Sequence, residues 1–198
     1  LSLPSISITT DLANLFNTST GIYVNATNDG RDWERPASVE LINPNGDPGF
    51  SGNAGLRIRG GDSRGDFNPR HACRFYCRSE YGDNKLNYPL FGEEGVDEFD
   101  VLDLRNEQNY SWSSEGNPQN THLREVFGRD LQRDLNQPYT RSRYYHLYVD
   151  GVYWGVSQTQ ERVEEFYGES YFGGNEADYD VVKAGLADVG GTQLSAGN

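Results

Sequence analysis

The stretch RIRGGDSRGDFNPRHACRFYCR, residues 57–78, contains the residue types best suited to chemistry in this sequence. It holds six arginines and one histidine against two aspartates, although the chain of 198 residues has a formal net charge of −13. Guanidinium groups bind phosphates and carboxylates through paired hydrogen bonds, and glycine-containing loops let backbone N–H groups approach an anion. The stretch therefore predicts a site for an anion about the size of a phosphate group.

A second explanation of these arginines stays open. The glycine pair at 60–61 is followed neither by the Gly-Lys-Ser/Thr of a Walker loop nor by the helix of a dinucleotide fingerprint. With thirty acidic residues in the chain, the arginines could simply be paired with carboxylates on a solvated face of a sheet, while the glycines serve only the turn. The residues alone favour neither explanation.

Strands must position this stretch, because apolar and polar residues alternate on both sides of the glycine loop. Leu56 and Ile58 alternate with Arg57 and Arg59, which predicts a strand with the arginines on the face opposite the core. The same alternation or a turn signal predicts further strands at 5–10, 21–25, 37–43, 54–60, 72–78, 99–105, on both sides of Asp150-Gly151, and at 179–184. We expect strands 54–60 and 72–78 to pair antiparallel.

The first strong helix signal covers residues 122–135. Its apolar residues keep the helical spacing and predict a face that packs on the sheet: Leu123, Val126, Phe127, Leu131 and Leu135. A shorter helix is expected around 161–167. This order predicts an α+β fold with a mainly antiparallel sheet and one long packed helix.

Cys73 and Cys77 lie four residues apart in an alternating strand. Four strand residues span roughly 13 Å, which is too far for a disulfide, so we expect two buried free thiols. A metal site with His71 is the alternative, and it would need a helix here. The acidic run at 93–103 lacks the ligand spacing of a calcium loop, which favours a solvated face.

Length and charge restrict the class of protein. A chain of 198 residues suits one domain or part of a larger one, and its pI near 4.6 argues against nucleic-acid binding. No stretch approaches the ~20 apolar residues of a membrane span. Sequons at Asn17, Asn25 and Asn109 suit a secreted protein if the source glycosylates. The chain begins with Leu1 and ends without a closing element, so we expect a processed or truncated piece.

Long motifs in the sequence resemble the spore-coat-protein-H-like (CotH) kinase family, in particular its large secreted bacterial members. The motifs are LRIRGGDSR, NPRHACRFYCRSEYGDNKLNYPLF, LREVFGRDLQRDLNQPYTRSRYYHLYVDGVYWGVSQTQER and SYFGGNEADYDVVKA, and the resemblance runs from about Leu3 to Ala184. It implies that residues 1–198 form a single domain segment, the N-terminal part of an atypical protein-kinase-like fold. It also implies ATP as phosphate donor with Mg, a protein serine as acceptor, and a secreted or cell-surface location.

The resemblance also assigns roles to residues. The positions that it implies face the nucleotide are Arg59, Gly60, Gly61, Ser63, Arg64, Arg70, His71, Arg74 and Glu161. Glu125 is the candidate for the acidic partner that orients the basic residue. The metal-binding and acceptor-activating aspartates of the family belong to its later half, which is absent from this sequence, so the catalytic and metal residues are not identified.

Two departures from the family pattern leave two functions open. Arg70 stands where the family usually has lysine, and Glu125 is displaced by one residue from the usual Arg-Asp-Glu. The first function is an ATP-dependent protein kinase of the CotH type. The second is a catalytically degenerate kinase-like module that acts as a secreted binding or structural domain, for example within a larger surface protein.

Overall fold

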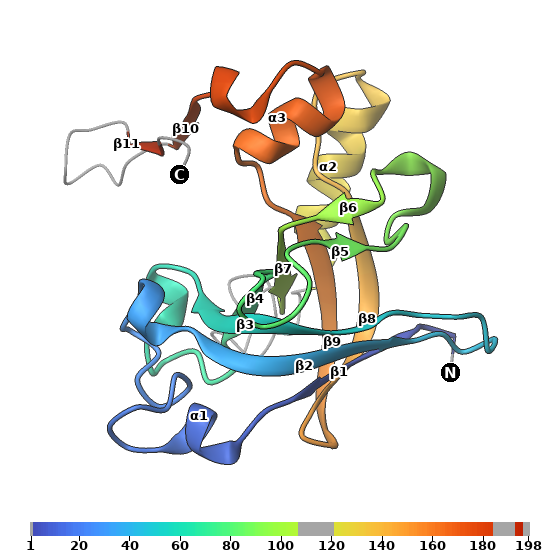
Figure 1. Ribbon diagram of the computed structural model, residues 1–198. Helices are drawn as coiled ribbons and strands as arrows, with labels where there is room; N and C mark the ends of the chain where they lie inside the picture. Colours follow the sequence, from blue (N-terminus) through green and yellow to red (C-terminus); the bar gives the residue numbers. More distant parts are fainter. Residues whose placement is uncertain (1, 107–120, 184–192, 196–198) are drawn as a thin grey trace. The chain divides into compact units, whose positions relative to one another are not determined.

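The computed structural model describes residues 2–106, 121–183 and 193–195 (Figure 1). The chain forms two compact units, Leu1–Gln160 and Glu161–Asn198. We describe each unit by itself.

The first unit is built on a closed barrel of seven strands in the order β1-β2-β3-β4-β7-β9-β8. The barrel strands are β1 (Ser5–Thr9), β2 (Arg35–Ile42), β3 (Ser51–Arg59), β4 (Ala72–Tyr76), β7 (Val101–Arg105), β8 (Ser142–Val149) and β9 (Val152–Glu161). Further elements of this unit are α1 (Leu12–Phe16), η1 (Arg31–Trp33), η2 (Asp62–Arg64), β5 (Leu86–Asn87), η3 (Gly92–Glu94), β6 (Glu98–Phe99) and α2 (Arg124–Asp134). Strands β5 and β6 form a separate two-stranded sheet.

The barrel closes through one parallel pair. Strand β1 pairs antiparallel with β2 and parallel with β8, and Ser5 lies opposite His146. The pairs β2–β3, β3–β4, β4–β7 and β8–β9 are antiparallel. Strands β8 and β9 form a hairpin in which Asp150 and Gly151 both have positive φ, as a tight two-residue turn requires.

The core fills the barrel because one face of each strand is apolar. Side chains that alternate inward include Ile6 and Ile8 of β1, Leu56 of β3, and Leu104 of β7, all almost fully buried. Tyr145 is also enclosed, and burial raises the pKa of its hydroxyl to about 12, so it stays protonated at neutral pH. The barrel interior is therefore a packed hydrophobic core.

The second unit is small and contains short helices and a two-stranded sheet. It contains α3 (Glu165–Phe172), η5 (Glu176–Asp178), β10 (Val181–Lys183) and β11 (Gln193–Ser195), the last two paired antiparallel. Asn175 caps η5, because its side chain accepts a hydrogen bond from the Ala177 N–H. The helix predicted around residues 161–167 corresponds to α3, which begins later, at Glu165.

The local predictions were partly confirmed. Strands β3 and β4 pair antiparallel with Ile58 opposite Cys73, as expected for residues 54–60 and 72–78. Both cysteines are free, as predicted, but only Cys73 is buried within the strand, whereas Cys77 is half-buried and follows the end of β4. Residues 21–25 form turns, so the strand predicted there was wrong.

The predicted fold class was wrong. The protein is mostly β with a closed barrel and only short helices, of which α2, with 11 residues, is the longest described. It is not a sheet covered by one long packed helix that resembles the N-terminal part of a kinase-like fold. Most of the α2 stripe is exposed to solvent, through Leu123, Phe127, Leu131 and Leu135, and only Val126 of the predicted stripe is half-buried, where it lies beside residues of β2 and β8. The opposite, polar side of α2 faces the strands instead, through Glu125 and Arg129.

Candidate anion-binding site

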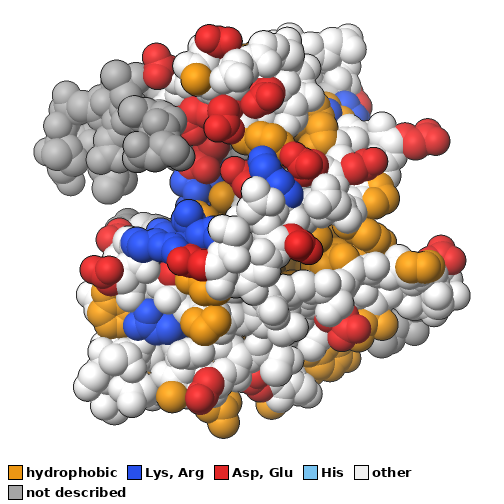
Figure 2. Space-filling model, viewed as in Figure 1, with side chains coloured by type: hydrophobic (Ala, Val, Ile, Leu, Met, Phe, Trp, Pro, Cys, Tyr) orange, Lys and Arg blue, Asp and Glu red, His pale blue; other side chains and the backbone are white. Residues whose placement is uncertain are grey.

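Charged side chains lie on the outer face of β3, β4 and β7. Since Leu56, Phe75 and Leu102 point into the core, the residues between them point outward. Arg57 lies opposite Arg74, and Arg74 lies opposite Asp103, so three charged residues form one row across the sheet. In the view of Figure 2, several Lys and Arg side chains gather together with acidic side chains beside them.

Asp103 is the buried acidic centre of this face. Arg59 donates from Nε to Oδ2 at 2.7 Å, and Arg74 donates from Nη2 to the same oxygen at 3.1 Å. Burial raises the pKa of the Asp103 carboxyl, but the hydrogen bonds and charges of the two arginines outweigh burial and lower it overall. The pKa of Arg74 is raised, because Asp103 outweighs burial for it as well. Asp103 and Arg74 are therefore both charged at neutral pH.

A second carboxylate, Glu125 of α2, lies beside this group. Arg105 forms an ion pair with Glu125, and Arg129 approaches the same carboxylate oxygen, Oε1, at 3.4 Å. Buried Gln158 of β9 joins the pair, since its amide donates to Glu125 Oε2 at 3.0 Å and accepts from Arg129 at 3.3 Å. Gln158 and Ser142, which accepts from Arg129 at 2.8 Å, fix how α2 lies against the barrel.

The described part of this outer face brings together more guanidinium groups than carboxylates. Four guanidinium groups, of Arg59, Arg74, Arg105 and Arg129, share two carboxylates, those of Asp103 and Glu125. Burial, followed by the charge of Arg59, lowers the pKa of Arg105 to about 10, although Glu125 opposes the shift.

Arg105 also retains an unused donor. Its side chain is 14% exposed, and its Nε is buried without a hydrogen-bond partner among the described residues. A buried donor without an acceptor is unfavourable, and a bound anion would provide the acceptor together with the missing negative charge.

A separate ion cluster lies farther along the same face. Glu34, which is buried, binds Arg57 at 2.6 Å and Arg78 at 3.2 Å, and it also pairs with Arg31. The guanidinium groups of Arg57 and Arg78 lie over the ring of Tyr76, at 4.2 Å and 4.8 Å from its centroid. Arg57 and Arg78 are thus held both by the Glu34 carboxylate and by the Tyr76 ring, so we do not include them in the candidate site.

The loop after β3 has a structural reason for its glycine. Gly60 has a φ of 123°, and a Cβ at this position would lie 2.0 Å from the Ser63 hydroxyl. Ser63 is buried, and its carbonyl accepts a hydrogen bond from Asn68 at 2.8 Å. Gly61 is exposed, whereas Arg64 pairs with Asp29 at 3.3 Å.

The structure does not bring Arg70 and His71 to the Arg59–Arg105 group. Arg70 donates to the Val156 carbonyl at 3.0 Å and packs on Gly155, and burial lowers its pKa. The His71 ring contacts Tyr23 with centroids 4.8 Å apart, and burial lowers its pKa, so it is neutral at pH 7. Both residues help to hold the loop.

Glu161 belongs to the second unit, in which it accepts a hydrogen bond from Tyr171. It is buried there. Of the positions derived from the resemblance, Arg59 and Arg74 lie on the outer barrel face, and Glu125 contacts that group from helix α2. The Gly60–Arg64 loop and Arg70–His71 lie next to β3 and β4 along the chain. The resemblance implied that Glu125 orients the basic residue at position 70. In the structure Glu125 instead pairs with Arg105 and Arg129.

The described residues contain no cluster of three or more His, Cys, Asp or Glu that could hold a metal ion. In the acidic run, Glu94 pairs with Arg143 at 2.6 Å and accepts from Tyr139 at 3.0 Å, which is not the arrangement of a calcium loop. Burial raises the pKa of Cys73 to about 12 and that of Cys77 to about 11, so both thiols are unreactive at neutral pH.

The sequence interpretation missed Asp103, Arg105, Arg129 and Gln158. A signal existed for two of them, because the alternation in residues 99–105 places Asp103 and Arg105 on the face opposite Leu102 and Leu104. Asp103 was instead counted with the solvated acidic run, although it is only 3% exposed. No local pattern indicates that α2 turns its polar side toward these strands.

The fold and the site together define a β-barrel protein with a cluster of arginines and carboxylates on its outer face. Residues 56–196 match the family model described as CotH kinase protein, and the chain belongs to this family. A search of curated proteins found no match. None of the described helices has the length and apolar character needed to cross a membrane.

Proposed function

We propose that this protein is an ATP-dependent protein serine phosphotransferase of the CotH type, and that the outer-face arginines hold the phosphates of the nucleotide. Membership of the kinase family supports the reaction class. The observation that carries the site is the surplus of guanidinium charge around Arg105, whose buried Nε lacks an acceptor among the described residues.

Each residue of the site has a role in this proposal. Arg105 and Arg59 donate to phosphate oxygens and neutralise their charge, which is the main contribution of a protein to phosphoryl transfer. Glu125 orients Arg105, and Gln158 holds Glu125 in turn. ATP supplies the transferable phosphoryl group when bound, and we expect a divalent ion to arrive with it.

The acceptor and the location belong to the same proposal. A secreted or cell-surface protein that phosphorylates another protein, or that forms part of a larger surface protein, agrees with the acidic pI near 4.6 and with the three sequons. Treatment of the purified natural protein with a glycosidase, followed by mass spectrometry, would test the location through glycans at Asn17, Asn25 or Asn109.

The second candidate function is a kinase-like module that binds without transferring. The pairing of Arg59 and Arg74 with buried Asp103 favours it, because these arginines already have a structural partner. A radiolabel transfer assay on the intact protein separates the candidates. Transfer to a protein serine supports the phosphotransferase, whereas ATP binding without transfer supports the degenerate module.

Replacement of Arg105 tests the site. We expect Arg105→Ala to weaken ATP binding by about 1.5–3 kcal/mol, the scale of a charge-assisted hydrogen bond, which is roughly 10- to 150-fold in Kd. Calorimetric titration with ATP and magnesium measures it. Arg105→Lys should retain part of the affinity, because the charge remains while the forked donor is lost.

The matched control is Arg133→Ala on helix α2. This change removes the same charge from a side chain that is 42% exposed and pairs with Asp130 and Asp134. It should leave ATP affinity nearly unchanged. Equal losses for Arg105→Ala and Arg133→Ala would mean that only net charge matters, and the assignment of the site would be wrong.

A further inference from the structure

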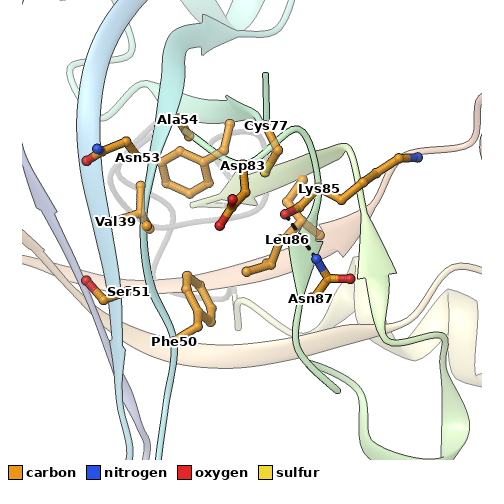
Figure 3. Close-up of a pocket in the computed structure, with 13 residues that line it drawn as sticks. Val39, Phe50, Ser51, Asn53, Ala54, Cys77, Asp83, Lys85, Leu86 and Asn87 are labelled. Carbon is orange, nitrogen blue, oxygen red and sulfur yellow. Dashed lines mark hydrogen bonds between the residues drawn. The ribbon is translucent and has the colours of Figure 1, made fainter. Parts of the chain in front are cut away.

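A cavity of about 150 Å³ lies at one end of the barrel, away from the charged outer face (Figure 3). Its walls come from β2, β3, β4 and β7, and the segment 83–87 borders it. The lining residues are Val39, Phe50, Ser51, Gly52, Asn53, Ala54, Phe75, Cys77, Asp83, Lys85, Leu86, Asn87 and Leu102.

Gly52 is the reason that this space is empty. It pairs with Val39, which points into the core. It also lies on the same face of β3 as Ala54 and Leu56, whose side chains point inward. A side chain at position 52 would therefore point into the barrel, and a Cβ added there would meet nothing within 4 Å. Glycine within a strand lowers stability and often marks close approach of a ligand.

The interior of the cavity is apolar. Val39, Ala54, Phe75 and Leu102 belong to the buried core, and Phe50 packs against it. A ring or a branched alkyl group can fill such a space, since apolar cavities of about this volume bind benzene. The cavity could therefore hold one ring-sized apolar group.

The opening of the cavity carries a carboxylate. Figure 3 shows the Asp83 carboxylate projecting over the space between Val39, Phe50 and Leu86. The Lys85 side chain runs away from the cavity, and its ammonium lies 3.8 Å from Glu98. The charge beside the opening is thus negative, and it favours a cation.

We propose that this cavity binds a small organic cation: an ammonium group on a ring-sized apolar body, with the body beside Gly52 and the ammonium at Asp83. The ring buries apolar surface against Val39, Phe50 and Phe75. The ammonium donates to the Asp83 carboxylate, which no described side chain occupies. This binding site is independent of the proposed phosphate site, because the two share no residue.

The probe is benzylamine, titrated into the ¹⁵N-labelled protein and followed by NMR. We expect saturable shifts of the amides at 52–54 and 83–87 at millimolar benzylamine. Benzyl alcohol, which has the same ring without the charge, should bind roughly fivefold more weakly, the scale of one exposed ion pair. Benzoate should bind more weakly still.

Two variants divide the proposal into its parts. Gly52→Val fills the cavity with a side chain that suits a strand, and it should abolish the benzylamine shifts while the protein keeps its near-UV circular dichroism. Asp83→Asn should leave binding of the ring intact, so that benzylamine and benzyl alcohol bind this variant with equal affinity. Asp47→Asn, an exposed carboxylate that does not line the cavity, is the control and should change nothing.

The opposite results would overturn the proposal. Absence of shifts at millimolar benzylamine, or equal benzylamine binding by the Gly52→Val variant, would rule out the cavity as the site. Equal binding of benzylamine and benzyl alcohol by the unmodified protein would contradict selection of a cation by Asp83. ATP titration in the presence of benzylamine reports on the phosphate site separately.

Discussion

Asp103→Ala should destabilise the protein by about 3–5 kcal/mol, because it removes a buried carboxylate and leaves the partly buried charges of Arg59 and Arg74 without their partner. The carboxylate is 3% exposed and accepts hydrogen bonds from both arginines. Denaturant unfolding followed by circular dichroism measures the effect. Asp130→Ala on the exposed part of α2 is the control and should change stability by less than about 0.5 kcal/mol. A loss below about 1 kcal/mol for Asp103→Ala would show that water reaches the arginines.

The same carboxylate gives a pH dependence with a definite sign. Because the folded protein lowers the pKa of Asp103 below its ordinary value of 3.8, its contribution is fully present above that value. The contribution is lost as the pH falls through the still lower folded pKa. The difference in unfolding free energy between the unmodified protein and Asp103→Asn should therefore be constant near neutral pH and shrink in strong acid.

Phe91→Ala should cost about 3–5 kcal/mol in unfolding free energy, the usual loss when a fully buried ring is removed. The Phe91 side chain is 1% exposed, and its ring contacts that of Phe99 edge to face with centroids 5.6 Å apart. Phe127→Ala makes the same chemical change on α2 at a position that is 61% exposed. It should cost less than about 0.5 kcal/mol in this chain.

The two phenylalanine variants test the orientation of α2 directly. If the apolar stripe of α2 packed on the sheet, as its spacing suggested, Phe127→Ala would cost as much as Phe91→Ala. Equal losses in chemical denaturation would therefore contradict the structure. A large loss only for Phe91→Ala would confirm that α2 turns its polar side inward.

Local pairs were predictable from the sequence because both partners lie close together along the chain. The alternation around Leu56 and Cys73 specified two neighbouring strands, and Asp150-Gly151 specified the β8–β9 turn. Closure of the barrel was not predictable in this way. It depends on β1 meeting β8, and alternation carries no information about which distant strand becomes the neighbour.

The site shows the same limit. Arg59 and Arg74 were found because they lie in one conspicuous arginine-rich stretch. Their partner Asp103 comes from a third strand, and Glu125 comes from a helix whose spacing pointed its other side inward. A helix stripe normally packs on the core, but three hydrogen bonds from Arg129 and Gln158 favour the opposite rotation here.

Barrel closure bears on where this protein can be cut for expression. The family match begins at residue 56, inside β3, whereas β1 and β2 come earlier in the chain and complete the ring of strands. A fragment designed on the match alone would lose both strands and most of β3. It would expose the backbone donors and acceptors of β4 and β8 as free edges, which are templates for aggregation. The folding unit therefore starts before the family signature, and β1 and β2 belong in any fragment meant to avoid these free edges.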